Sequence, residues 1–271
     1  MKKLTGILTL IVILALGLTG CGKSEDVAQN KVLKVGATPV PHSELLEQVK
    51  PILAEQGIEL EIVEFTDYVK PNLALNDEEI DANFFQHVPY LESFNADRGL
   101  DLISVGTIHV EPLGLYSDKY DNIDQLPEGA LIAVPSDAVN GGRALILLQT
   151  QGLITLKADA GLEATELDIV ENPKNFEFKS IEAAQLPRVL PDVDAAIING
   201  NFAIQAKLNP SKDSLILEGS ESPYANIITV KSDYDNKEEI NALLDALQTE
   251  AINNFIAENY DGGVVSAFSK K

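Results

Sequence analysis

Short runs of β-branched residues alternate with amphipathic helical segments along most of this chain. Residues 32–37 have the mostly apolar character of a buried strand, and residues 58–65 alternate apolar and polar side chains as a half-buried strand does. Between them, residues 43–56 place their large aliphatic side chains on one helical face. A strand–helix–strand order that repeats in this way favours an α/β fold, in which helices cover the faces of a sheet.

The same alternation continues toward the C-terminus. It predicts further strands at residues 82–85, 102–108, 131–134, 195–198 and 227–230. It predicts helices at residues 69–75, 89–97, 141–151, 183–189, 202–207 and 237–259.

Two turns, residues 111–114 and 220–223, divide this pattern into two parts. We expect the chain to leave a first lobe at one turn and to return at the other. Lobe 1 would then contain residues 32–111 and 227–271, and lobe 2 residues 112–226. Two α/β lobes joined by two crossovers leave a cleft between them, where a small ligand can bind.

The first twenty residues have the pattern of a secretory signal. Met1, Lys2 and Lys3 give a positively charged start, and residues 4–20 carry no charge. This uncharged run is shorter than the roughly 20 apolar residues that a membrane-spanning helix needs. We therefore expect residues 1–20 to be a signal peptide that is absent from the mature fold.

The only cysteine of the chain follows directly, in the segment Leu18-Thr19-Gly20-Cys21. This segment resembles the lipobox of bacterial lipoproteins, in which the sulfur of the cysteine carries a diacylglycerol. Residues 21–31 are polar and without periodicity, which is typical of a flexible tether. We expect a lipid on Cys21 to anchor the protein at the extracytoplasmic face of the cell membrane, on the periplasmic side or the cell surface.

The composition excludes several classes of function. A formal net charge of −22 argues against nucleic acid as a partner. The sequence has no Gly-rich phosphate loop, no Gly-x-Ser-x-Gly and no His-Glu-x-x-His, so we expect neither catalysis nor a cofactor. No pair among His42, His87 and His109 has metal-ligand spacing, so no metal site is expected, although these residues and an acid could still meet in space.

Aromatic side chains gather in the run Phe-Phe-Gln-His-Val-Pro-Tyr at residues 84–90, with Tyr68 upstream. Rings at a strand-to-helix junction can line an apolar pocket and contact a sulfur atom that enters it. An ordinary core cluster beneath the start of a helix would have the same composition, and the residues alone leave both interpretations open.

A polar cluster is the second candidate. The segment Asn140-Gly141-Gly142-Arg143 is expected at a helix N-terminus, where free N–H groups attract an anion. Arg143 would be repelled by that helix end unless a ligand carboxylate relieved the conflict; the alternative is a solvated arginine that points away. Amide groups are available from Asn199, Asn201 and Asn226, although asparagine is also common in turns.

At these residues the chain is similar to the methionine-binding lipoproteins of ABC importers, the NlpA/MetQ family. The similar segments are residues 35–39, 81–90, 140–143, 196–201 and 222–226, and the resemblance extends from the lipobox nearly to the C-terminus. It implies a two-lobed periplasmic-binding-protein fold of the type II-like kind, with two crossovers and the ligand in the interlobe cleft. It also implies delivery of the ligand to an ABC permease that a cytoplasmic ATPase drives.

The resemblance assigns roles to individual residues. Tyr68, Phe85, His87 and Tyr90 would face the ligand side chain, and Arg143 would take the α-carboxylate. Asn201 and Asn226 would hold the polar head of the ligand, together with Asn140 and Asn199. Phe84 would narrow the pocket if it faced it.

The resulting prediction is a solute-binding lipoprotein that captures methionine without catalysis, with the stereochemical preference left open. One alternative keeps the class but changes the cargo to another amino acid or a methionine-containing dipeptide. A second alternative is a surface adhesin that feeds no transporter.

Overall fold

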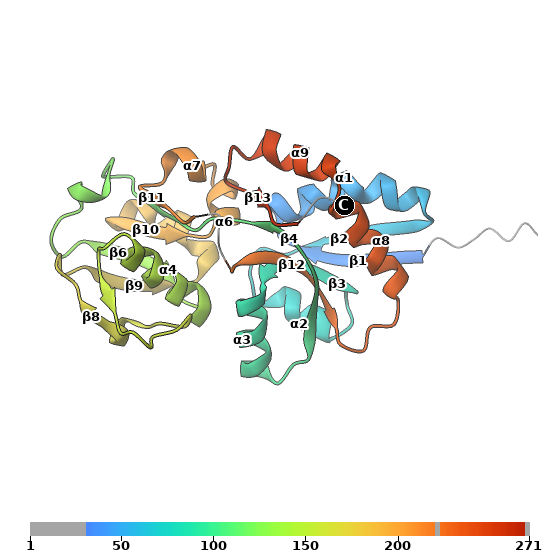
Figure 1. Ribbon diagram of the computed structural model, residues 1–271, viewed down its shortest axis with the longest axis horizontal. Helices are drawn as coiled ribbons and strands as arrows, with labels where there is room; N and C mark the ends of the chain where they lie inside the picture. The colour runs from blue at the N-terminus through green and yellow to red at the C-terminus, as the bar shows by residue number, and fades with distance from the viewer. Residues whose placement is uncertain (1–30, 220–222, 269–271) are drawn as a thin grey trace, which may run out of the picture. The chain divides into compact units, whose positions relative to one another are not determined.

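The computed structural model describes residues 31–219 and 223–268 (Figure 1). The predicted signal peptide, Cys21 and the tether up to residue 30 lie outside the described residues. Those predictions therefore stay predictions.

Six strands form the first sheet, in the order β13-β4-β12-β3-β1-β2. Strand β1 runs parallel to β2 and β3, whereas β12 runs antiparallel to β3 and β4. The strands are β1 (Lys31–Ala37), β2 (Ile58–Glu64), β3 (Ala82–His87), β4 (Leu102–Val110), β12 (Ala225–Lys231) and β13 (Val265–Ser266).

Helices cover both faces of this sheet (Figure 1). On one face, the leucines of α1 (Glu44–Glu55) and α8 (Lys237–Leu247) pack with Leu33 and Val35 of β1 in the main core. On the other face, α2 (Lys70–Asn76) and α3 (Val88–Arg98) pack over Ile227. Neighbouring residues of a strand point to opposite faces of the sheet. Because helices cover both faces, apolar residues occur on both.

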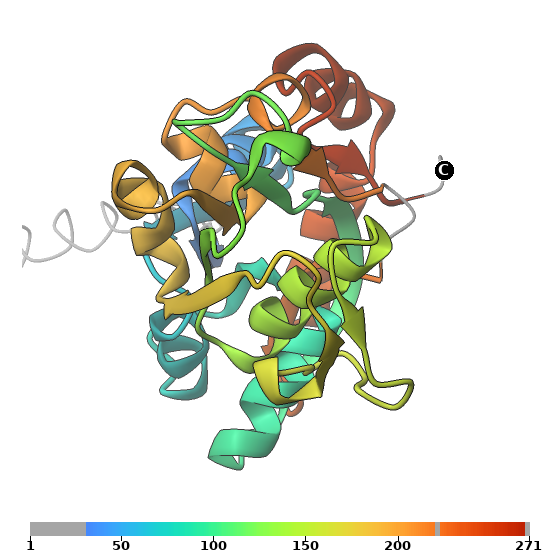
Figure 2. The ribbon, with the colours of Figure 1, turned by 90° about the vertical axis from the view of Figure 1, so that its left-hand side faces the viewer.

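Five strands form the second sheet, in the order β11-β5-β10-β6-β9. The strands are β5 (Gly114–Tyr116), β6 (Leu131–Pro135), β9 (Glu177–Ile181), β10 (Ala195–Ile198) and β11 (Ile216–Leu217). Figure 2 turns this part of the molecule, coloured green to orange, toward the viewer. Helix α4 (Ala138–Thr150) packs on one face, and α5 (Leu186–Val189) with α6 (Gly200–Gln205) on the other.

Shorter elements complete the described chain. They are η2 (Pro39–Ser43), η3 (Ile123–Gln125), the hairpin β7 (Thr155–Leu156) and β8 (Ile169–Glu171), η4 (Glu166–Asp168), η5 (Ala183–Gln185), η6 (Leu190–Asp192), α7 (Pro210–Asp213) and α9 (Glu250–Asn259). Within the described ranges, no helix combines the length and the apolar character needed to cross a membrane.

The chain passes from the first sheet to the second between β4 and β5, and returns between β11 and β12. The predicted α/β class with two crossovers is therefore confirmed. The described residues belong to one compact unit, so the residue limits of the two lobes stay a prediction.

Two predicted helices differ from the structure. The C-terminal helix is two helices, because the Thr249 side chain accepts a hydrogen bond from the Ile252 N–H and starts α9 as an N-cap. Helix α4 begins at Ala138, three residues before the predicted start, and its N-cap is Asp137. The Asp137 carboxylate accepts the Asn140 N–H at 2.9 Å, so this helix end is already occupied by an anion.

Gly142 lies inside α4 because the segment 162–164 crosses it closely. A Cβ at this position would lie 2.2 Å from the Leu162 backbone oxygen. We expect Gly142→Ala to lower the free energy of unfolding by about 1–3 kcal/mol, since a rigid backbone must move to make room. Urea denaturation measures the change. Gly219→Ala is the control, because a Cβ there meets no atom of the described residues within 4 Å. An equal loss in both variants would contradict the packing argument.

Candidate functional site

A pocket with about 340 Å³ of atom-free space lies where segments from both sheets meet. Its lining contains all nine residues that the sequence analysis assigned to the ligand. The complete lining is Tyr68, Phe85, Gln86, His87, Tyr90, Glu111, Asn140, Arg143, Asn199, Gly200, Asn201 and Asn226. Glu111, Gln86 and Gly200 are the members that the sequence did not single out.

Aromatic rings form one wall of the pocket. The Tyr68 ring lies 5.9 Å from both Phe85 and Tyr90, measured between ring centroids. Tyr90 donates its hydroxyl hydrogen to the Tyr68 backbone oxygen at 3.0 Å, and Phe94 packs behind it. Packing and hydrogen bonding therefore hold these rings in place before any ligand enters.

Phe84 does not belong to this wall. Its ring lies in the core of the first sheet, 4.6 Å from the ring of His42 and 5.3 Å from that of His109. Consecutive side chains of β3 point to opposite faces of the sheet. Phe84 is therefore buried in the core, whereas Phe85 faces the pocket. Phe84 therefore does not narrow the pocket.

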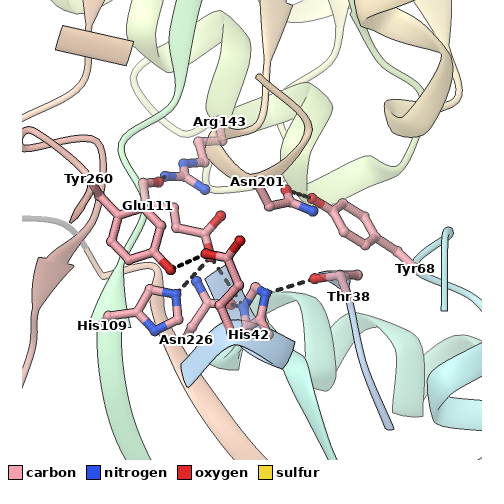
Figure 3. Close-up of polar contacts among 10 residues, drawn as sticks. Thr38, His42, Tyr68, His109, Glu111, Arg143, Asn201, Asn226 and Tyr260 are labelled. Atoms are coloured by element: carbon pink, nitrogen blue, oxygen red, sulfur yellow. Dashed lines mark hydrogen bonds and ion pairs between the residues drawn. The ribbon is translucent and has the colours of Figure 1, made fainter. Parts of the chain in front are cut away.

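Glu111 is a buried acid that two imidazoles surround (Figure 3). Its Oε1 atom lies 2.7 Å from His109 Nε2 and 3.2 Å from His42 Nε2. The backbone N–H of Asn201 also donates to this carboxylate. Three N–H groups thus point at one carboxylate, which is the arrangement that favours its ionised form.

The hydrogen-bond partners of His42 identify its tautomer. Nε2 lies near two acceptor oxygens, that of Glu111 and the Asn226 Oδ1 at 3.1 Å, so it carries the proton. Nδ1 then accepts from the Thr38 hydroxyl at 2.7 Å. Burial lowers the pKa of His42 to about 4 and that of His109 to about 3, so both rings are neutral at neutral pH.

The charge of Glu111 is therefore not matched by these rings. Burial raises the pKa of Glu111, and the electrostatic interaction with His42, the hydrogen bond from the Asn201 N–H and the charge of Arg143 oppose that increase only in part. A positively charged group that entered the pocket beside Glu111 would supply the missing counter-charge.

Among the described residues, His42, His109 and Glu111 are the group whose donor atoms could hold a metal ion, since these atoms lie within 4.8 Å of one another. The sequence spacing did not predict this meeting. A tetrahedral zinc site with bonds of about 2.0–2.1 Å separates its donor atoms by roughly 3.3 Å. The distance of 2.7 Å between His109 Nε2 and Glu111 Oε1 is that of a hydrogen bond instead.

Arg143 lies in the second turn of α4 and is almost fully buried. Its Nε donates to Glu218 Oε1 at 2.9 Å, and its Nη2 donates to Glu218 Oε2. The second Nη2 hydrogen goes to the Glu111 backbone oxygen at 2.9 Å, and the guanidinium lies 4.2 Å above the Tyr224 ring.

This geometry corrects the expected environment of Arg143. The residue is not at a helix N-terminus. Its Nε and Nη2 groups bind Glu218 and do not point into the pocket. Within residues 31–219 and 223–268, no hydrogen bond engages Nη1, so this is the nitrogen that Arg143 can offer to a ligand.

The amide side chains connect both parts of the pocket wall. Asn199 donates to Asn140 Oδ1 at 2.8 Å, and His87 Nε2 approaches the same oxygen at 3.4 Å. Tyr68 donates its hydroxyl hydrogen to Asn201 Oδ1 at 2.6 Å. The Oδ1 of Asn199 is buried without a hydrogen-bond partner in the described part of the chain, so an acceptor remains for a ligand or a water.

Similar proteins are known. The family model described as "NlpA lipoprotein" matches residues 33–268. The probable D-methionine-binding lipoprotein MetQ of Vibrio cholerae is 43% identical over 252 residues, which cover 93% of each chain. The membrane lipoprotein TpN32 of Treponema pallidum is 42% identical over 256 residues, 94% of each chain. A nutrient binding protein from Burkholderia cenocepacia, whose structure contains bound methionine, superposes with a TM-score of 0.84 at 46% identity, covering 87% of this chain and all (100%) of that one.

Proposed function

Because this chain belongs to the NlpA lipoprotein family and has its periplasmic-binding-protein fold, we propose that it captures methionine for an ABC importer, without chemical change to the ligand. One observation carries the proposal: a single pocket combines a buried acid whose imidazole neighbours are neutral, an arginine and a wall of aromatic rings. A zwitterionic amino acid with an apolar side chain matches these three features.

The ammonium group of the ligand would bind Glu111. The carboxylate lines the pocket, and its neighbours His42 and His109 are neutral. A ligand ammonium would balance the charge of Glu111 and donate to the oxygen atoms that the imidazoles leave accessible.

The ligand carboxylate would bind Arg143 Nη1 and side-chain amides. Both Asn201 and Asn226 use their Oδ1 atoms as acceptors for protein groups, Tyr68 and His42 respectively. Their Nδ2 groups are then the donors that can turn toward a carboxylate.

The ligand side chain would lie against Tyr68, Phe85, His87 and Tyr90. Aromatic rings attract the polarisable sulfur of a thioether as well as its methylene groups. His87 stays neutral in this wall, because burial and the charge of Arg143 lower its pKa to about 3.

Ligand entry would require the two lobes, residues 32–111 with 227–271 and residues 112–226, to separate. Opening breaks the hydrogen bond between Tyr68 and Asn201 and the contact between His87 and Asn140. A bound ligand that contacts both lobes would favour the closed form. Anchored through Cys21 at the outer face of the membrane, the loaded protein would pass methionine to a permease and its ATPase.

Binding of L-methionine to refolded protein tests the proposal. The protein is first unfolded to release any ligand that copurifies, and the released material is identified by mass spectrometry. Calorimetry is expected to show one-to-one binding and a raised melting temperature, since a ligand that binds only the folded state stabilises it. Binding of another amino acid or a dipeptide alone would change the cargo, whereas no binding of any of them would favour the adhesin alternative.

A further inference from the structure

Glu218 is a partly buried acid that does not line the pocket and that contacts Arg143. It follows β11 directly, in the segment that returns to the first sheet. Its two carboxylate oxygens hold Nε and Nη2 of Arg143, and its side chain is only 16% exposed. The pair is therefore largely shielded from solvent, and its two parallel hydrogen bonds fix its geometry.

Glu218 is itself fixed by the other segment that connects the sheets. Its backbone N–H donates to the Leu113 oxygen at 2.9 Å, and the Leu113 N–H lies 3.3 Å from Glu218 Oε2. Arg143 also binds the backbone oxygen of Glu111, two residues before Leu113. Both connecting segments therefore meet at one guanidinium group.

Among the described residues, the hydrogen bonds to protein groups leave only one nitrogen of the Arg143 guanidinium, Nη1, available to a ligand. It has five N–H hydrogens, of which Nε carries one and Nη2 two. Glu218 takes two of these three, and the Glu111 backbone oxygen takes the third. The two Nη1 hydrogens are the remainder, and Arg143 lines the pocket.

We propose that Glu218 is a positioning residue for ligand recognition, which holds Arg143 so that Nη1 faces the ligand carboxylate. The proposal rests on the proposed function and adds a residue to it. Without the Glu218 carboxylate, the guanidinium loses the two bonds that set its plane, and its free rotamers compete with the productive one. Recognition of the ligand carboxylate then weakens, while recognition of the rest of the ligand does not.

Glu218→Gln tests the proposal, with L-methionine and methionine amide as the probes. Glutamine keeps the shape but offers an N–H where Arg143 needs an acceptor. We expect the affinity for methionine to fall about tenfold or more. The affinity for methionine amide, which lacks the carboxylate, is expected to stay within about threefold of wild type. In an Arg143→Ala background, Glu218→Gln is expected to add almost no further loss for methionine.

Two variants complete the experiment. Glu78→Gln breaks a surface ion pair with Lys231 of 2.6 Å and is the matched control, with both affinities unchanged. Glu218→Asp keeps the charge but shortens the side chain, and is expected to lose part of the preference for methionine; it replaces Glu218→Gln if circular dichroism shows the latter unfolded.

Equal losses for both probes would mean that Glu218 only supports the fold. Unchanged methionine binding would mean that Glu218 has no part in recognition, and tighter binding would mean that it competes with the ligand for Arg143. Each of these results overturns the positioning role. Failure of wild-type protein to bind methionine would instead refute the proposed function itself.

Discussion

Arg143→Ala is expected to weaken methionine binding by roughly 30-fold to several thousand-fold, because truncating one partner of a buried charge pair costs about 2–5 kcal/mol. The variant leaves the ligand carboxylate without a cation and also leaves Glu218 without its partner. Arg143→Lys is expected to recover only part of the affinity, since one ammonium cannot hold Glu218 and a ligand in the geometry of the guanidinium. Calorimetry with refolded protein measures both.

Methionine amide and two other arginines provide the controls. The amide should bind wild type weakly and be almost indifferent to Arg143→Ala. Arg98 stacks 4.0 Å above the Phe94 ring, and neither Arg98 nor Arg188 lines the pocket, so their alanine variants should bind methionine normally. Methionine binding by a folded Arg143→Ala variant within about threefold of wild type would show that this residue does not hold the carboxylate.

Glu111→Gln is expected to cost a similar amount, about 30-fold to several thousand-fold in methionine affinity, because a buried ammonium group would lose its counter-charge. Glutamine retains the volume and one acceptor for His42 and His109, so the variant is expected to fold. Desamino-methionine, which carries the carboxylate and thioether but no ammonium, should bind Glu111→Gln at least as well as wild type.

The pH dependence of binding gives a second measurement on the same residue. Burial raises the pKa of Glu111 in the ligand-free protein. The ionised carboxylate binds the ammonium, so methionine affinity should decrease as the pH falls through this raised pKa and be retained above it. Glu111→Gln should lose that pH step.

Glu44→Gln is the matched control for both measurements. Glu44 accepts a hydrogen bond of 2.5 Å from Tyr260 and does not line the pocket. If Glu44→Gln lowered methionine affinity as much as Glu111→Gln, the loss would come from perturbed folding and the ammonium assignment would be wrong.

The sequence by itself determined the class of fold and most of the pocket lining. Periodicities of two and 3.6 residues are local properties, so they identified strands and helices without knowledge of their neighbours. The lining residues could be predicted for a similar reason, because they lie in short runs at the ends of predicted strands, such as residues 84–90 and 199–201. Their assignment to methionine came from a family resemblance carried by the same runs.

The start of α4 and the break between α8 and α9 were missed although their signals are local. Asp137 and Thr249 are N-cap residues, and each competes with a longer helical pattern that surrounds it. A hydrophobic stripe continues across such a break, so periodicity alone does not show where one helix ends.

Only the tertiary structure brought Glu111 and Glu218 to their partners. Arg143 and Glu218 are 75 residues apart in the chain, and Tyr68 and Asn201 are 133 apart. The environment of Glu111 depends on the order and register of strands, since β12 places Asn226 opposite His109 of β4 on one side and opposite His87 of β3 on the other. Local patterns specify which residues can form a strand, whereas the pairing between distant strands follows from the packing of the whole core. The charges that we expect to bind the ligand are set by that packing.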